Sequence, residues 1–404
     1  MIQEVFRPGE SGEGVLTPEI YVQDYSVERR GEEKLGSPLS YSRLNEFLEC
    51  PGCFNVRQEK RFRVPETEEM VVGTIFHDLV AYSHSPVNEE KIKFRSPRKL
   101  LNYMKYFYPE RLRMSRDGKK AIGFLEKRKG GELKDEELGQ FVMETAAEAM
   151  VRYYLLNYWA IIESQERTID FSLNSSWGKM PMTARIDQVR QRPIGEWARR
   201  TGGRRRTLVR QIVELKRKVG ENRLDLSLQT GIQLLAYQAF FHRRENPEIV
   251  VYDGEAGKKF LRKGGDEGYL VAGLVCAKRA MDLGFNEPNQ SDPFHKHYPQ
   301  LRSQPELYME ALDGFEGIMS PEEGRKWHEA AKAAFEAYNQ SCEWEEVPAT
   351  VSVKRLAKGD FRIELLNEVC FDCGRNLMAN LDDWTYCSEH GRVGKIKREW
   401  KRRI

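Results

Sequence analysis

Three short strand patterns, enclosed by helical patterns, constrain the fold of this chain most. Apolar and polar residues alternate over Thr168–Leu173 and over Met182–Val189, and a third strand is predicted at Thr207–Lys216. Apolar residues spaced three to four apart predict a long helix from Glu136 to about Ser164 and another from about Ser227 to His242. The order helix, three strands, helix is typical of an α/β fold, in which a mixed central sheet is flanked by helices.

The chain has 404 residues, which is enough for two or three domains. Its start is rich in Gly and Glu and shows little periodicity, which indicates a mobile arm. The region after residue 245 is irregular, apart from a strand predicted at Tyr269–Cys276 and a helix predicted from Ser320 to about Asn339. We therefore expect an N-terminal arm (1–36), a core (37–245) with a basic hairpin insertion (189–210), an accessory region (246–345) and a C-terminal module with a basic tail (346–404).

The net charge of +3 conceals a strong asymmetry. Between Val189 and Gly220 there are eleven Lys and Arg against two Glu, a net charge of +9. Between Gly391 and Ile404 there are seven against one, a net charge of +6, so the rest of the chain carries −12. Two concentrated basic segments on an acidic body indicate a surface for a polyanion. The alternative is a solvated loop and a charged tail.

No apolar run approaches the roughly 18–20 residues that span a bilayer, and the acidic N-terminus does not resemble a signal peptide. We therefore expect a cytoplasmic protein without a membrane partner. Seven cysteines in a chain of this length fit reduced thiols or metal ligands better than a disulfide framework.

The third predicted strand carries the most informative chemical pattern. Glu214 and Lys216 are two residues apart, so on a strand both side chains point to the same face. Asp187 is expected to end the preceding strand, and if the two strands pair as a hairpin its carboxylate can meet that of Glu214. Two carboxylates can hold Mg²⁺ or Mn²⁺, which take oxygen ligands and neutralise charge on a phosphate. For an isolated E-x-K pattern, the alternative is a surface salt bridge.

Further motifs surround this pattern in a fixed order. With it, the motifs are Ser40-Tyr41-Ser42 with Cys50-Pro51 and Phe54, then Gly73-Thr74-Ile75-Phe76-His77, Ile186-Asp187, Glu214-Leu215-Lys216 and Gln233-Leu234-Leu235-Ala236-Tyr237. Together these five motifs resemble the RecB-like branch of the PD-(D/E)XK nuclease superfamily, which includes the RecB and AddB nuclease domains and the CRISPR-associated RecB-like exonucleases.

The resemblance implies a restriction-endonuclease-like core and a metal-dependent DNA nuclease. It further implies an exonuclease that acts on DNA ends or single strands in recombination, repair or replication. His77, Asp187 and Glu214, with the Leu215 carbonyl, would bind one or two Mg²⁺ or Mn²⁺ ions. Lys216 would orient or help deprotonate the attacking water.

The resemblance leaves other roles open. Gln233 and Tyr237 would contact the scissile strand or the lysine, with a core position as the alternative for Tyr237. On the inserted hairpin, Arg204, Arg205 and Arg206 would bind the DNA backbone without reading its sequence.

Two departures from the branch concern substrate geometry. The branch often has Gly where this chain has Ala184, and the 27 positions from Asp187 to Glu214 are more than usual. An inactivated nuclease fold that binds nucleic acid or acts as a scaffold is the alternative function. The sequence contains no phosphate-binding loop of a helicase motor, so a helicase or recombination partner would be a separate chain.

The C-terminal cysteines indicate a second metal site. Cys370-x-x-Cys373 and Cys387-x-x-His390 have the spacing of a structural Zn²⁺ site, which is our prediction. The resemblance supplies the alternative, a [4Fe–4S] cluster in which Cys50 takes the place of His390. Cys53 complicates both assignments, because it forms a C-x-x-C pair with Cys50.

Overall fold

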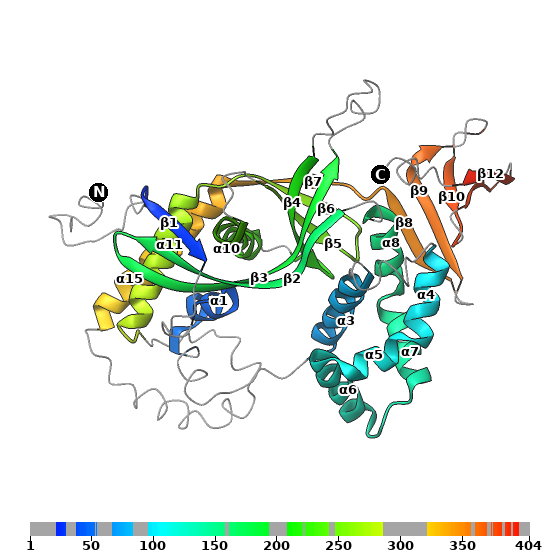
Figure 1. Ribbon diagram of the computed structural model, residues 1–404, viewed down its shortest axis with the longest axis horizontal. Helices are drawn as coiled ribbons and strands as arrows, with labels where there is room; N and C mark the ends of the chain where they lie inside the picture. The colour runs from blue at the N-terminus through cyan, green and yellow to red at the C-terminus, as the bar shows by residue number, and fades with distance from the viewer. Residues whose placement is uncertain are drawn as a thin grey trace.

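The computed structural model describes most of the chain, and its elements are arranged as Figure 1 shows. The described residues are 22–29, 38–52, 54, 67–83, 96–157, 161–193, 208–220, 223–241, 247–285, 321–356, 360–369, 373, 375–381, 384–388 and 391–395. The described helices are α1 (Tyr41–Glu49), α3 (Glu68–Ser83), α4 (Pro97–Tyr106), α5 (Tyr108–Met114), α6 (Arg116–Lys129), α7 (Asp135–Thr145), α8 (Ala147–Asn157), α10 (Arg223–Phe241), α11 (Glu267–Asp282) and α15 (Pro321–Ser341). The described strands are β1 (Tyr25–Arg29), β2 (Ile161–Ser175), β3 (Gly178–Pro193), β4 (Leu208–Lys216), β5 (Glu248–Asp253), β6 (Lys259–Gly264), β7 (Cys342–Val347), β8 (Val351–Arg355), β9 (Phe361–Val369), β10 (Asn376–Ala379), β11 (Trp384–Cys387) and β12 (Gly391–Lys395).

Local sequence explains where several helices begin and end. Ser40, Ser96 and Ser115 precede α1, α4 and α6, and each side-chain oxygen accepts a hydrogen bond from the backbone N–H three residues later. These bonds satisfy donors that have no partner inside the helix. Gly130 ends α6 with a φ of 76°, a left-handed conformation that glycine adopts without strain.

The larger sheet contains seven strands in the order β1-β2-β3-β4-β5-β6-β7. Neighbouring strands are antiparallel except β4 and β5, which are parallel, so the sheet is mixed. Helices lie on both faces, which confirms the predicted α/β class. Strands β5, β6 and β7 come from the predicted accessory region, and the structure includes them in the same sheet.

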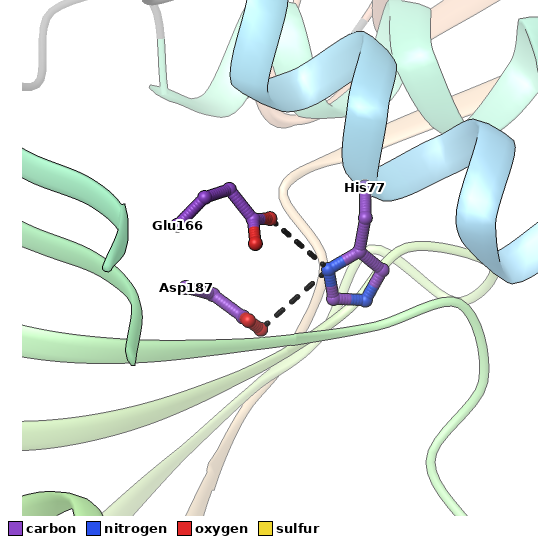
Figure 2. A group of neighbouring side chains, drawn as sticks. All are labelled: His77, Glu166 and Asp187. Atoms are coloured by element: carbon purple, nitrogen blue, oxygen red, sulfur yellow. Dashed lines mark ion pairs between the residues drawn. The ribbon is translucent and has the colours of Figure 1, made fainter. Parts of the chain in front are cut away.

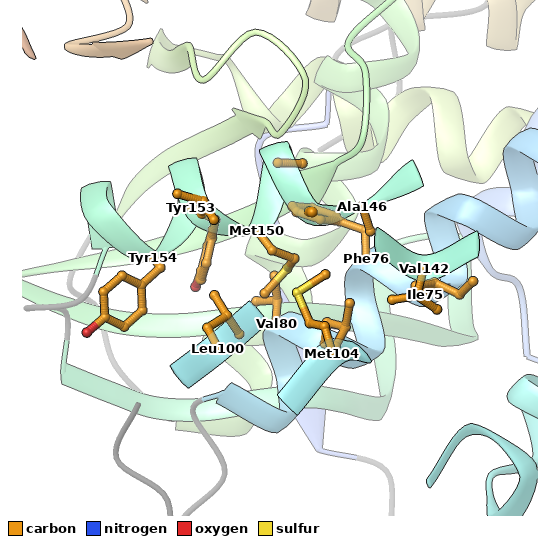
Figure 3. Close-up of a cluster of buried hydrophobic side chains, with 14 of the residues drawn as sticks. Ile75, Phe76, Val80, Leu100, Met104, Val142, Ala146, Met150, Tyr153 and Tyr154 are labelled. Atoms are coloured by element: carbon orange, nitrogen blue, oxygen red, sulfur yellow. The ribbon is translucent and has the colours of Figure 1, made fainter. Parts of the chain in front are cut away.

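The two faces of the sheet are covered by different helices, and β4 shows the division. Ile212 packs in a cluster that includes residues of α10, α11 and α15. Val213 and Leu215 pack on the other side, in a cluster built from α3 to α8. Figure 3 shows part of this second cluster, where side chains from α3, α4, α7 and α8 meet. Strand β4 is therefore buried on both faces, as expected of the centre of a sheet.

The single helix predicted from Glu136 to Ser164 is wrong. The chain forms two helices, α7 and α8, which meet at Ala146, and residues from Ile161 onward belong to β2. Ile162 pairs with Arg190 of β3. The helical spacing of apolar residues continued by coincidence into a segment whose β-branched residues favour a strand.

The strand predicted at Tyr269–Cys276 is also wrong, because these residues lie within helix α11. Asp266 caps that helix by accepting a hydrogen bond from the Gly268 N–H at 3.0 Å. A short apolar run does not distinguish a buried strand from a buried helix, which explains the error. Helix α15 agrees with its prediction to within two residues at the C-terminal end, Ser341 against Asn339. Among the described residues, no helix is both long and apolar enough to cross a membrane.

The C-terminal residues form a second sheet of five antiparallel strands, in the order β12-β11-β10-β9-β8. Arg152 of α8 joins this sheet to the larger one. Its guanidinium donates to the carbonyl of Gly254, at 2.8 Å, and to that of Val353 in β8, at 3.1 Å. The side chains of Val351, Val353 and Ile363 also belong to the cluster formed by α3 to α8.

The packing of α11 against α15 depends on Gly273. A Cβ atom at this position would lie 2.5–2.8 Å from three carbon atoms of the Phe335 ring, whereas a Cβ atom at Gly123 in α6 would meet nothing within 4 Å. We predict that Gly273→Ala lowers the free energy of unfolding by about 1–3 kcal/mol through overpacking. Gly123→Ala should raise it by roughly 0.5–1 kcal/mol, because alanine favours the helix. Urea unfolding followed by circular dichroism measures both, and a stabilising Gly273→Ala would contradict this packing.

Candidate active site

The two carboxylates singled out by the sequence lie on neighbouring strands. Strands β3 and β4 pair in antiparallel fashion, with Gln188 opposite Val213. Asp187 precedes Gln188, and its Oδ2 atom accepts a hydrogen bond from the Leu215 N–H at 2.8 Å. The prediction that Asp187 ends its strand is wrong, because β3 continues to Pro193. Asp187 and Glu214 are 5% and 3% exposed, so both carboxylates are buried within the sheet.

The carboxylate of Glu214 is held by side chains of β4 and α10. Lys216 places its Nζ atom 2.8 Å from one carboxylate oxygen of Glu214. Gln229 donates to that same oxygen at 2.6 Å and accepts from the Lys216 ammonium at 2.8 Å. Gln233 donates to the other oxygen of Glu214 at 2.6 Å and to the carbonyl of Arg185 at 2.9 Å. Helix α10 therefore fixes both the acid and the base of the E-x-K pattern.

His77 reaches the same place from helix α3. Its neighbour Phe76 is buried and contacts the ring of Tyr153 edge-on, with 6.3 Å between ring centroids. Because consecutive residues of a helix point about 100° apart, burying Phe76 turns His77 toward β2 and β3. The Nδ1 atom of His77 lies 3.7 Å from Asp187 Oδ2 and 3.5 Å from Glu166 Oε1, as Figure 2 shows.

Glu166 is a site residue that the sequence analysis missed. In the register of β2 against β3, Gln165 pairs with Gln188 and Arg167 pairs with Ile186, which sets Glu166 opposite Asp187. Its backbone has a φ of 46°, an unusual and strained value for a residue with a side chain. The second oxygen of Glu166 pairs with the Arg185 guanidinium.

Glu166 could have been found from the sequence, but only with the pairing register of β2 against β3. The strand was predicted to begin at Thr168, which left Glu166 outside it. Counting both strands back from the turn that joins Ser175 to Gly178 places Glu166 opposite Asp187.

The carboxylates around His77 give the candidate site an excess of negative charge. Burial, followed by the charge of Glu214, raises the pKa of Asp187 well above its ordinary value. Burial alone would lower the pKa of His77, but the hydrogen bond and charge of Glu166 and the charge of Asp187 outweigh it and raise that pKa. Carboxylates that repel one another in a buried place are stabilised by a cation.

The donor set fits a divalent metal ion. One nitrogen of His77 and one oxygen each of Glu166 and Asp187 lie within 4.8 Å of one another. An imidazole and two carboxylates are common ligands of divalent ions. The third member of the predicted ligand set, Glu214, is beside Asp187, but its oxygens bind Lys216, Gln229 and Gln233 in this structure.

The other residues proposed from the sequence fall in different places. Tyr237 is fully buried and packs against Phe241, with 4.7 Å between ring centroids. Gln233 lies in the site. Arg204, Arg205, Arg206, Cys370 and His390 lie outside the described residues, and Cys387 is in β11 with its side chain not described. Cys373 is partly buried.

Cys50 is the cysteine on which the iron–sulfur alternative depends. It is 2% exposed and follows directly after α1. In Figure 1, α1 lies below the larger sheet, whereas β9 and β10 lie at the right of the view, well apart from α1. The structure therefore separates Cys50 from the strands that flank the C-terminal cysteines.

A mixed sheet that presents three carboxylates and a lysine at one point, beside a histidine from a neighbouring helix, has the features of a metal-dependent phosphodiesterase. The family model of the PD-(D/E)XK nuclease superfamily matches residues 38–374, and the chain belongs to this superfamily. The match confirms the resemblance at the level of the superfamily. A comparison with curated proteins finds no match.

The geometry predicts that Glu166 contributes to metal binding. We predict that Glu166→Gln weakens Mn²⁺ binding at least about tenfold, because one of the charged ligands is lost. Electron paramagnetic resonance of free Mn²⁺ measures the affinity without any reaction.

Glu163→Gln is the matched control for this variant. Glu163 lies on the same strand, also pairs with an arginine, and its side chain is 18% exposed, as is that of Glu166. Its carboxylate pairs with Arg210 and is not part of the His77 cluster. Equal loss of affinity in both variants would mean that only the overall charge matters.

Proposed function

We propose that this protein is a metal-dependent nuclease that cuts DNA, and that it does so as an exonuclease on ends or single strands. The observation that carries the proposal is the buried pair Asp187 and Glu214 on adjacent strands, with Lys216 on the face of Glu214. Membership in the PD-(D/E)XK superfamily supports the same class of reaction.

His77, Glu166 and Asp187 would hold a divalent ion, Mg²⁺ or Mn²⁺, with Glu214 and the carbonyl of Leu215 next to it. Such an ion neutralises charge on the scissile phosphate and makes a bound water more acidic. The distances among the three donors support this ligand set.

Lys216 is the residue of this chain that acts on the attacking water. Its side chain is 32% exposed, and its ammonium is held in a fixed position by Glu214 and Gln229. From there its positive charge would orient the water, favour the loss of a proton from that water and offset the negative charge that develops on the phosphate. Gln233 acts as a positioning residue, because it holds Glu214 and the backbone of Arg185.

The substrate proposed is DNA bound through its backbone. The basic stretch from Val189 to Gly220 is continuous with β3 and β4, and Arg204, Arg205 and Arg206 are its most concentrated positive charges. Contacts from arginines to phosphates do not depend on base sequence. Resemblance to the RecB-like exonucleases favours digestion from ends, with a separate helicase or recombination protein to open duplexes.

We predict that Asp187→Asn abolishes cutting and that Lys216→Ala lowers its rate by roughly 10²–10³-fold, as loss of one charge-stabilising group typically does. Lys326→Ala is the control, because this lysine is exposed and lies on α15, outside the basic stretch from Val189 to Gly220. The measurement uses 5′- and 3′-labelled single- and double-stranded DNA with Mg²⁺, Mn²⁺ or EDTA.

Three outcomes would contradict the proposal. Wild-type rates in either site variant would contradict the proposed catalytic residues. Cutting that persists in EDTA would show that the reaction does not require a metal ion. Cutting of circular DNA at the same rate as linear DNA would show an endonuclease.

We also propose that the C-terminal sheet carries a structural Zn²⁺ held by Cys370, Cys373, Cys387 and His390. The strand order supports it, because β9 pairs with β10 at Val369 and Asn376, and β11 pairs with β12 at Cys387 and Gly391. Both cysteine pairs therefore belong to connections at the same end of neighbouring strands. Cys50 follows directly after α1, which Figure 1 shows well apart from β9 and β10, and this separation counts against a cluster that includes Cys50.

The zinc proposal predicts a colourless protein with about one tightly bound zinc per chain, as a closed four-ligand site requires. His390→Ala should lose zinc and lower the melting temperature, whereas Cys50→Ser should keep the zinc. Elemental analysis and absorption of anaerobically purified protein distinguish the two metals. A brown protein with several irons per chain that loses them in Cys50→Ser would establish the cluster instead.

A further inference from the structure

Helices α4, α5 and α6 form a basic surface that the proposed reaction does not use. From Ser96 to Gly130 the chain has eleven Lys and Arg against three Asp and Glu, a net charge of +8. Every residue of this segment is described, and most of the basic side chains are exposed. Some pair with acids, such as Arg113 with Asp135 at 2.8 Å. In the part of the chain that the structure describes, no ion pair is found for Lys99, Lys119 or Lys127.

Two adjacent aromatic rings are exposed within the same basic segment. Tyr106 and Phe107, where α4 meets α5, are each 63% exposed. Nearly parallel rings lie beneath Phe107. Tyr103 is tilted 11° from it with 6.4 Å between centroids, and Tyr82 is tilted 8° from Tyr103 with 4.6 Å between centroids. The guanidinium of Arg111 lies 4.2 Å from the centroid of Tyr82.

Packing in the core of the helices does not explain this whole stack of rings. Tyr103 and Phe107 are four residues apart in a helical segment, so their contact alone is an ordinary helical pair. Core packing accounts for Tyr103, which is buried, but not for Phe107 and Tyr106, whose rings face water. Exposed rings among lysines and arginines are the arrangement that binds single-stranded nucleic acid, because each unpaired base stacks on a ring and phosphates pair with the cations.

The surface is connected to the candidate active site through α3. Arg111 pairs with Asp78, the residue that follows His77, at 3.6 Å. Arg128 of α6 pairs with Glu68 at the start of α3. Asp117, near the start of α6, interacts electrostatically with Arg185, which holds Glu166. Helices α5 and α6 are therefore joined by ion pairs to the helix that carries His77, and a strand bound along them would lead toward the site.

We propose that α4, α5 and α6 bind the single-stranded part of the DNA substrate, with bases stacked on Phe107 and Tyr106 and phosphates along the basic helices. This inference rests on the proposed nuclease function and adds a preference for unpaired strands. A duplex presents its bases only at the ends, so the rings distinguish the two forms.

The test is binding of fluorescently labelled oligonucleotides in EDTA, measured by anisotropy on the full chain. Replacing both rings, Tyr106→Ala with Phe107→Ala, should weaken single-strand binding at least about tenfold and leave duplex binding unchanged, since each base–ring stack is worth about 1–3 kcal/mol. Trp177→Ala is the matched control, because Trp177 is an exposed ring, 47% accessible, at the turn between β2 and β3.

A second pair of variants tests the charges. Lys119→Gln with Lys127→Gln should reduce the slope of log affinity against log salt by roughly 0.7 for each lost phosphate contact with a single strand. Lys263→Gln with Lys326→Gln, which removes two exposed lysines of β6 and α15, should leave the slope unchanged. Unchanged single-strand affinity in the double ring variant, or equal loss for single strands and duplex, would overturn the inference.

The failure of this inference is distinguishable from that of the nuclease assignment. A protein that needs Phe107 for single-strand binding but cuts no DNA would overturn the proposed function and support the binding surface. If the protein cuts DNA and the double ring variant keeps full affinity and rate, the proposed function is supported and the binding surface is overturned.

Discussion

The rest of the site depends on the burial of two carboxylates side by side. Asp187 and Glu214 lie on paired strands where water does not solvate them, so each must be stabilised by the protein or by a cation. The Leu215 N–H donates a hydrogen bond to Asp187. Glu214 is bound by Lys216, Gln229 and Gln233. These donors come from one strand and one helix, which explains why α10 follows β4 in the chain and packs over it.

The sequence predicted the part of the fold that short-range patterns determine. Alternation identified β2 and β3, a third strand pattern identified β4, and the E-x-K pattern located Glu214 and Lys216, because a strand of period two brings both to one face. It did not predict β5, β6 and β7, whose place in the sheet depends on pairing with strands distant in the chain. Strand β5 in particular is buried apart from its first residue, so its pattern lacks the polar alternation that marks a half-exposed strand.

A residue of the site could be predicted from the sequence where neighbouring residues determine its position, and could not be predicted where distant parts of the chain do. His77 could be recognised only through its motif, since nothing in helix α3 alone brings it near Asp187. Glu166 could not be recognised from composition, because its role comes from the register of β2 and from an unusual backbone angle. Tyr237 lies one helical turn after Gln233 on nearly the same side of α10, yet Gln233 binds Glu214 in the site and Tyr237 packs in the core. Spacing alone does not distinguish these two environments.

The parallel pairing of β4 with β5 has a consequence for how the chain is made. When a ribosome has synthesised β2, β3 and β4, the outer edge of β4 has no partner, because a parallel neighbour needs the whole of α10 to return. An unpaired edge of a hydrophobic strand is prone to associate with other chains. Strand β7 then completes the sheet near residue 347. The site strand therefore acquires its final surroundings late in synthesis, and the growing chain depends on α10 and β5 to cover an edge that would otherwise aggregate.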